Sequence, residues 1–254
     1  MAQRQPDREI VPAVQRLRVR YAKRGRLRFA SHRDFQRAFE RALRRAGVPM
    51  AYSAGFSPHP KVSYAGAAPT GAASEAEYLE IGVLAPLDPD AVRAALDAGL
   101  PPGLDVVDVV VARSGSLAER LTASIWRIEL PGVTPVAAQT PVAEFLGREM
   151  VEVQRRTKSG IRTFDARGAV VELSVESSAA DGPPCAILHL VVRHQTPAVR
   201  PDDVLSALHQ VADLVLSAPP QVTRQAQGSL DDSTGAVSDP LAADRGPAGH
   251  AAGA

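Results

Sequence analysis

The sequence predicts an α+β protein whose N-terminal half is a ferredoxin-like split βαβ arrangement. The segment RLRVRY at 16–21 alternates strictly between arginine and apolar residues, which is typical of a half-buried strand. Residues 31–47 have the apolar spacing of an amphipathic helix. Strand and helix patterns continue in the order β-α-β-β-α-β across roughly 16–112, which is the order of the split βαβ motif.

The predicted helix at 31–47 has clear start and stop signals. Ser31 is suited to cap its first turn, and Gly47 ends it as a C′ glycine. The predicted buried stripe consists of Phe35, Phe39, Ala42, Leu43 and Ala46. A second face carries arginines at four- and three-residue steps, namely Arg33, Arg37, Arg41 and Arg44.

The remaining elements of this half are shorter. A short strand is expected over Val48–Ser53, and further strands over 75–84 and 104–112. A helix over 86–99 has Asp88 at its cap and Pro89 at its first position. Little regular structure is expected from 54 to 75, and so long a connection is typical of functional or mobile segments.

Four regions follow from these patterns. We expect a flexible arm over 1–14, a ferredoxin-like domain over 15–113 and a second, smaller α+β domain over 120–216, which looks like a weak echo of the first. After Ser217 the composition turns to Pro, Gly, Ala, Ser and Asp, so we expect a disordered tail over 217–254.

Composition excludes several classes of protein. No run approaches 18 apolar residues and the first ten residues lack a signal-peptide core, so we expect a cytoplasmic chain without membrane contact. The single cysteine, Cys185, cannot form an internal disulfide or hold an iron–sulfur cluster alone. No Walker loop, GxGxxG, GxSxG or HExxH motif occurs. We therefore predict no cofactor, and the sequence carries no complete catalytic signature.

The net charge of +1 conceals an uneven distribution of charge along the chain. Before Pro49 the chain has fourteen Arg and Lys residues against four Asp and Glu residues, which favours a polyanionic partner. Lysine occurs only at Lys23, Lys61 and Lys158, so a GC-rich genome is an alternative source of the arginine excess.

The arginines of the first strand are expected on the open face of the sheet, where related sheets bind single-stranded RNA, although no aromatic pair for base stacking is evident. The segment RRTKSGIRTFDAR at 155–167 predicts a phosphate-binding turn, or else a solvated hairpin in which Asp165 pairs with an arginine. The residues predicted to contact RNA are Arg16, Arg18, Arg20, Arg37, Arg41, Arg44, Arg155, Arg156, Lys158, Arg162 and Arg167.

The loop GFSPHPK fixes His59 between Pro58 and Pro60, which suits acid–base chemistry, metal binding or a phosphate contact, or else a structural histidine. A site of two histidines and one carboxylate is conceivable from His32, Asp34 and His59, but their spacing matches no standard zinc motif. The candidate loop site is His32, Asp34, Phe56, His59 and Lys61, with no metal assigned.

These residues resemble a known family. The segments SHRDFQRAFERALRRAGVPMAYSAGFSPHPK and SEAEYLEI are similar to the radical-SAM-linked domain of unknown function, which has the patterns S-H-x-D, R-A-x-R-R-A, G-F-x-P-H-P and E-x-E-Y-L. The block RTKSGIRTFDAR is similar to its K-x-G and D-x-R signature, and the resemblance covers roughly 16–216. It implies a domain that is fused after a B12-binding radical SAM protein or encoded separately. This chain lacks the radical SAM barrel and cysteine motif, so the radical reaction cannot be assigned to it.

Three hypotheses of function follow. The first is an accessory module that binds RNA, such as tRNA or rRNA, and presents it to a separate radical SAM or RNA-processing enzyme. The second is a small metal- or histidine-dependent hydrolase or nuclease that uses His32, Asp34 and His59. The third is a protein-interaction adaptor for a radical SAM enzyme, docking through VSYAGAAPTG at 62–71.

Overall fold

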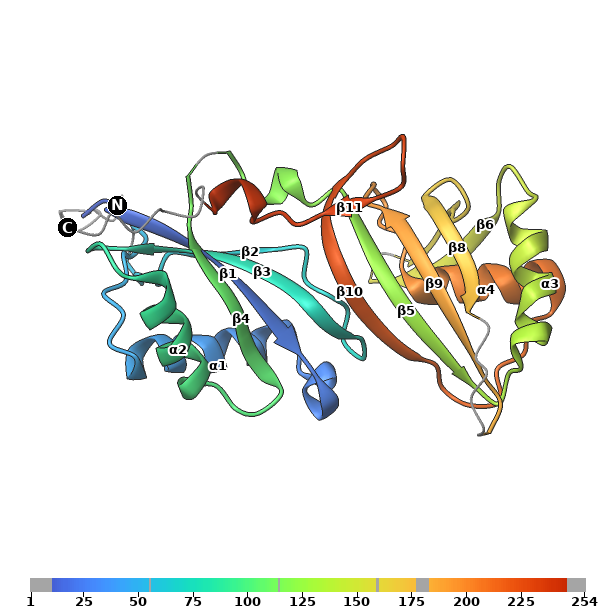
Figure 1. Ribbon diagram of the computed structural model, residues 1–254, viewed down its shortest axis with the longest axis horizontal. Coiled ribbons are helices and arrows are strands. Elements are labelled where there is room, and N and C mark those ends of the chain that lie inside the picture. Colours follow the sequence, from blue (N-terminus) through green and yellow to red (C-terminus); the bar gives the residue numbers. More distant parts are fainter. Residues whose placement is uncertain (1–10, 55, 114, 159, 177–182, 246–254) are drawn as a thin grey trace, which may run out of the picture. The chain divides into compact units, whose positions relative to one another are not determined.

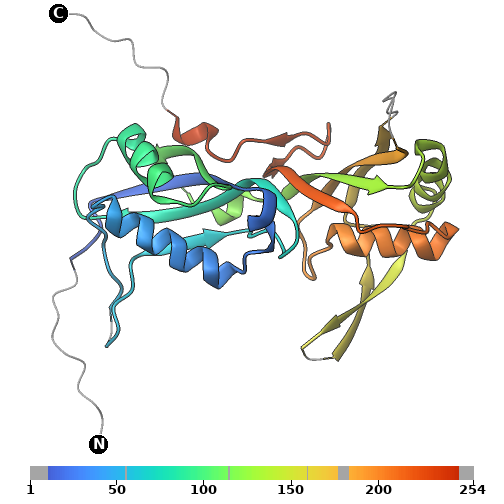
Figure 2. The ribbon, with the colours of Figure 1, turned by 90° about the horizontal axis from the view of Figure 1, so that it is seen from below.

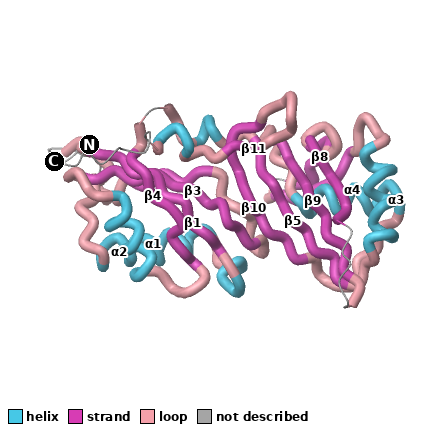
Figure 3. The backbone as a smooth tube through the Cα atoms, in the orientation of Figure 1, coloured by secondary structure: helices cyan, strands magenta, loops and turns pink. Residues whose placement is uncertain are grey.

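The computed structural model describes residues 11–245 except 55, 114, 159 and 177–182. Helices and strands are mixed throughout the described chain, which confirms the α+β class (Figure 3). The chain divides after Arg120 and again after Asp239 into two compact units. The N-terminal unit ends at Arg120 and regains Pro240–Arg245, and the second unit comprises Leu121–Asp239.

The N-terminal unit is an antiparallel sheet with α1 and α2 packed on one face (Figure 1). Its strands lie in the order β4-β1-β3-β2, with β1 between β4 and β3. Its elements are β1 (Gln15–Lys23), η1 (Gly25–Phe29), α1 (His32–Arg45), β2 (Val62–Ala65), β3 (Ala73–Val83), α2 (Pro89–Gly99), β4 (Leu104–Val111), η2 (Ala118–Arg120) and η3 (Ala242–Asp244).

The core of this unit follows from two periodicities. Alternate residues of β1, Leu17, Val19 and Tyr21, are buried against the helices, as the strand pattern predicts. The apolar stripe of α1 meets them, and the rings of Tyr21 and Phe35 stack with centroids 4.1 Å apart. Ser31 caps α1 by accepting a hydrogen bond from the Asp34 amide at 3.2 Å.

One predicted strand is replaced by isolated bridges. Val48–Ser53 forms only the single pairs Met50 with Val83 and Tyr52 with Pro60, so the prediction of a strand there is wrong. The strand that pairs with β3 is instead β2, whose register aligns Val62 with Ile81. Pro49 and the turns beyond Ser53 limit the length over which this segment can pair.

The second unit has its own antiparallel sheet in the order β10-β5-β9-β8. Helix α3 packs against β8, β9 and α4, and the β6–β7 hairpin projects away from this sheet (Figure 2). Its elements are β5 (Ala123–Pro131), α3 (Pro135–Leu146), β6 (Glu152–Thr157), β7 (Gly160–Asp165), β8 (Val170–Glu176), β9 (Cys185–Arg193), α4 (Pro201–Ala212), β10 (Gln221–Leu230) and β11 (Val237–Ser238).

The two units share one order of elements once the β6–β7 hairpin is set aside. Strand β5 lies between β10 and β9 as β1 lies between β4 and β3, and β8 takes the edge position of β2. The hairpin and β11 are the additions to the second unit. The hairpin is inserted between α3 and β8, which is the place that the loop from 46 to 61 occupies between α1 and β2.

The expected disordered tail is wrong for residues 217–245. Residues 221–230 form β10, which pairs with β5 along most of its length, and Pro240–Arg245 belongs to the N-terminal unit. The sequence of β10 is mostly polar, so its place in the sheet rests on backbone pairing rather than on apolar content. Residues 1–10 of the expected arm at 1–14 and residues 246–254 of the expected tail at 217–254 lie outside the described residues.

Helices long and apolar enough to cross a bilayer are absent from the described parts of the chain.

We predict that Phe39→Ala destabilises the N-terminal unit by about 3–5 kcal/mol, because a fully buried ring is replaced by a cavity. Phe39 is 0% exposed on α1. Denaturant unfolding followed by circular dichroism measures the change. Arg41→Ala on the exposed side of the same helix is the control, with an expected change within about 0.5 kcal/mol. Equal midpoints for the two variants would contradict this account of the core.

Candidate functional site

The outer face of α1 is a row of exposed arginines. The row is Arg33, Arg37, Arg41, Arg44 and Arg45, all of them exposed. No ion pair within 4 Å is recorded for any of these five side chains in the described chain. Their opposite face is the buried stripe of Phe35, Phe39 and Leu43. The packing of the helix therefore leaves its basic face to solvent.

Asp34 at the start of α1 takes part in the helix cap and also interacts with this face. Asp34 bonds to the Ser31 hydroxyl at 2.7 Å, and this bond, with the charges of Arg37 and Arg33, lowers the pKa of Asp34 below its usual value. Its carboxylate is therefore ionised at neutral pH, but it serves the helix cap. The five arginines form what we call the arginine face of α1.

A short 3-10 turn precedes this face in the chain. In η1, Arg26 is exposed and Phe29 is 59% exposed. The guanidinium carbon of Arg28 lies 4.8 Å from the centre of the Phe29 ring. An exposed aromatic ring next to cations is a surface on which a nucleobase can stack.

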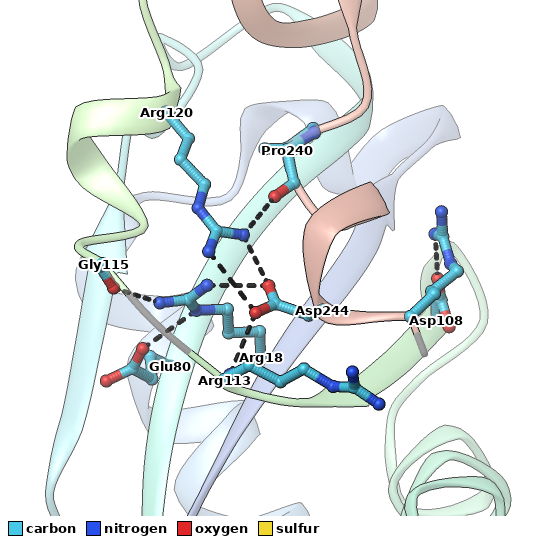
Figure 4. A network of polar contacts seen from close by, with 9 residues as sticks. Arg18, Glu80, Asp108, Arg113, Gly115, Arg120, Pro240 and Asp244 are labelled. Atoms are coloured by element: carbon cyan, nitrogen blue, oxygen red, sulfur yellow. Dashed lines mark hydrogen bonds and ion pairs between the residues drawn. The ribbon is translucent and has the colours of Figure 1, made fainter. Parts of the chain in front are cut away.

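The arginines of β1 differ from those of α1 in exposure and in pairing. Arg18 is 1% exposed and lies on the sheet face opposite the helices. Its guanidinium donates to Asp244 at 2.7 Å and to Glu80 at 3.1 Å, and also to the carbonyl of Gly115 (Figure 4). The prediction that Arg18 contacts RNA from an open face is therefore wrong for this structure, because η3 brings a carboxylate onto that face.

Asp244 is the centre of this network. Its carboxylate accepts from Arg18, from Arg120 at 2.6 Å and from the Arg113 amide at 3.0 Å (Figure 4). Burial alone raises the pKa of such a carboxyl, but these three donors outweigh burial, so the pKa of Asp244 lies below its usual value. Asp244 is thus a buried anion held by two guanidinium groups and one backbone N–H.

The other two arginines of β1 remain partly accessible. Arg20 is half-buried and donates to the carbonyl of Glu75 at 2.9 Å. The side chain of Arg16 is 70% exposed and lies 3.6 Å from Glu80. The three predicted β1 contacts therefore separate into one buried, one half-buried and one exposed side chain.

The loop residues do not assemble into a metal site. Nε2 of His32 lies 3.1 Å from the Gln36 side-chain amide, and its ring meets Tyr64 edge-on at 4.8 Å. His59 is exposed in the loop, and Phe56 is 64% exposed. Within the residues that the structure describes, no three His, Cys, Asp or Glu side chains are grouped to hold a metal ion.

The β6–β7 hairpin carries the second predicted basic segment. Arg156, Lys158 and Arg162 are exposed on it. Arg155 instead pairs with Asp203 at 2.8 Å and lies over the ring of Phe164 at 4.7 Å. Arg167 donates to the carbonyls of Val170 and Leu146. Three of the five predicted cations of this segment therefore face solvent, and two support the fold.

Sequence reasoning missed the residues that bury Arg18. Asp244 lies in a stretch whose composition is typical of disorder, and the nearby apolar Leu241, which is 0% exposed, is a local sign of burial. Arg120 pairs with the same carboxylate, and no local sequence pattern marks it as part of a buried network. A glycine inside a strand indicates a close approach of another segment, and Gly82 of β3 carries that signal.

Comparison with known proteins identifies a family but no activity. A family model described as "Uncharacterized protein conserved in bacteria (DUF2344)" matches residues 16–201. None of the curated proteins compared with the chain matches it. A solved structure titled "Crystal Structure of an Unknown Protein from Galdieria sulphuraria" is 16% identical and covers 83% of this chain and 98% of its own, with a TM-score of 0.24.

We predict that Asp244→Ala lowers the free energy of unfolding by about 3–5 kcal/mol, because it leaves two guanidinium charges without their shared anion. The pKa of Asp244 is lowered in the folded state. The contribution of the ionised carboxylate to the free energy of unfolding is therefore complete above the unfolded-state pKa of about 3.9, and it is lost as pH falls through the folded-state pKa.

Unfolding midpoints of wild type and variant, measured from pH 7 to pH 2.5, test this dependence. The matched control is Asp108→Ala, which removes the exposed pair with Arg245 and is expected to cost less than about 1 kcal/mol. If the difference in unfolding midpoint between wild type and Asp244→Ala stays constant down to pH 2.5, the role of Asp244 as a buried anion is refuted.

Proposed function

The chain belongs to the family of uncharacterized proteins conserved in bacteria (DUF2344), whose description assigns no activity, and from its geometry we propose that it binds RNA through the arginine face of α1. The observation that carries the proposal is the exposure of five arginines on one helix without an ion pair in the described chain. A concentration of unpaired positive charge is the footprint expected of a protein that binds a polyanion.

The dimensions of the face suit a nucleic-acid backbone. From Arg33 to Arg45 the helix rises roughly 18 Å, at about 1.5 Å per residue. That length is comparable to about five phosphates of one strand of a duplex at roughly 3.4 Å each. Arginine forms bidentate hydrogen bonds with phosphate, so the row is suited to follow a backbone rather than to read base edges.

Stacking residues near the face favour RNA with unpaired bases. Phe29 in η1 precedes α1 and is 59% exposed, with Arg28 against its ring. Recognition of RNA typically targets loops and ends, where unstacked bases can lie on aromatic side chains. The proposed ligand is therefore a structured RNA with single-stranded loops, such as tRNA or a segment of rRNA.

The proposal includes a role as an accessory module. The chain would hold RNA for a separate modifying or processing enzyme, for which the resemblance to radical-SAM-linked domains suggests a radical SAM protein. This second step rests on that resemblance alone. The exposed cations of the β6–β7 hairpin are a further proposed RNA contact, independent of α1.

We predict that Arg37→Ala, Arg41→Ala and Arg44→Ala combined weaken RNA binding at least tenfold at low salt. The slope of log affinity against log salt is negative, and its magnitude is expected to decrease by about 2, since each lost phosphate contact on a single strand changes it by roughly 0.7. Fluorescence anisotropy of labelled total tRNA over a salt series measures both values.

The matched control removes three arginines that lie elsewhere, Arg93, Arg113 and Arg148. It lowers the net charge by the same amount but leaves the arginine face intact, so tRNA affinity should change less than threefold. No binding of tRNA by the wild-type chain at low salt, or equal losses in the two triple variants, would overturn the proposal.

A further inference from the structure

A groove with two cations lies on the sheet face opposite the helices, away from the arginine face of α1. Strand register places Arg16 of β1 beside Gly82 of β3, and the Gly82 amide bonds to the Lys61 carbonyl at 3.0 Å. Neighbouring strands lie about 4.8 Å apart, so Arg16 and Lys61 flank Gly82 at roughly 10 Å from each other.

The side chains of this row point away from the core. Val62 and Tyr64 pack against the helix-side core, so Lys61 and Ser63 belong to the opposite face of the edge strand. Ser63 pairs with Glu80 in the next row, and Arg18 lies beyond Glu80. The face therefore presents Arg16 and Lys61 over glycine, followed by Ser63 and Glu80.

Two adjoining hollows occupy this face. One has a volume of about 570 Å³ and is lined by Arg16, Lys61 and Gly82, among others. The second has a volume of about 480 Å³ and includes Ala65 and Leu117 in its wall. Both hollows share Arg16, Ser63 and Glu80. Each volume lies within the range of roughly 300–1,000 Å³ that is usual for small-molecule sites.

Glycine is needed at the floor of the larger hollow. A Cβ built on Gly82 would lie 3.1 Å from the Cβ of Ala13 and 3.5 Å from that of Lys61. The chain segment at Ala13 therefore passes directly over the strand and forms one wall of the hollow. A larger residue at this position would push that wall outward and fill the space between the two cations.

The donor groups in the groove can still form hydrogen bonds or ion pairs with a ligand. Neither the Lys61 ammonium nor the Ser63 hydroxyl has a recorded hydrogen bond or ion pair in the described chain, and Arg16 has only its 3.6 Å pair with Glu80. An ammonium and a guanidinium on two walls of one hollow are suited to bind a phosphate group.

We propose that this groove binds a nucleotide, with its phosphate between Arg16 and Lys61. The ribose hydroxyls would then donate to Glu80 and Ser63, and the base would enter the second hollow, whose wall includes Ala65 and Leu117. The same chemistry fits a free mononucleotide or the 5′-phosphorylated end of an RNA. The site does not depend on the arginine face of α1, because it lies on the other face of the sheet.

Isothermal titration calorimetry with AMP, adenosine and inorganic phosphate tests the groove. AMP is expected to bind at least ten times more tightly than adenosine. Lys61→Ala and Arg16→Ala should each weaken AMP binding about tenfold, the effect of losing one charge-assisted contact. Ser63→Phe should abolish binding by filling the groove while both cations stay in place. Arg93→Ala on α2 is the control and should bind AMP as wild type does.

Competition against AMP by an RNA oligonucleotide with a 5′-phosphate or a 5′-hydroxyl identifies the source of the ligand. Stronger competition by the phosphorylated end assigns the groove to RNA ends, and equal competition assigns it to free nucleotides. The Arg37, Arg41 and Arg44 triple variant should keep AMP affinity, so failure of one site is distinguishable from failure of the other. Equal affinities for AMP and adenosine, no AMP binding at millimolar concentration, or wild-type affinity in Lys61→Ala, Arg16→Ala and Ser63→Phe would overturn the proposal.

Discussion

The buried ion pair between Arg18 and Asp244 sets which face of the N-terminal unit meets solvent. Strand alternation places Arg18 opposite the helices, and a guanidinium that is 1% exposed there requires an anion. Asp244 supplies it, and the same carboxylate also pairs with Arg120. The segment that carries Asp244 must therefore lie on β1, and part of the sheet face expected to be open is covered.

The arginines of α1 are exposed because no such segment covers them in the described chain. On β1, the carboxylates of Glu80 and Asp244 pair with Arg18, whereas α1 uses its own Asp34 at the cap. Cations opposite an apolar face, spaced by two residues on the strand and by three or four on the helix, thus give a buried network around Arg18 on the strand and an exposed basic face on the helix. The second unit repeats the order of elements and displays the exposed Arg156, Lys158 and Arg162 on the inserted β6–β7 hairpin.

The periodicity of the sequence predicted those features of the fold that depend on neighbouring residues. The alternation of β1, the stripe and cap of α1 and the Asp88 cap of α2 all follow from neighbouring residues. Partnerships across the chain could not be predicted, because nothing near Arg18 in sequence indicates a carboxylate at position 244. For the same reason β10 was missed, since its mostly polar residues are held by pairing with β5. The side-chain contacts of Arg155 and Arg167 likewise depend on distant carboxylate and carbonyl oxygens.

The most direct test of the central claim locates bound RNA on the chain itself. Ultraviolet crosslinking in cells, followed by nuclease and protease digestion and mass spectrometry, identifies the peptides joined to nucleotides. The account predicts crosslinked peptides from residues 26–45, which contain Phe29 and the arginine face of α1. Recovery of the chain without crosslinked RNA, or with crosslinks confined to residues outside that range and outside the β6–β7 hairpin, would contradict it.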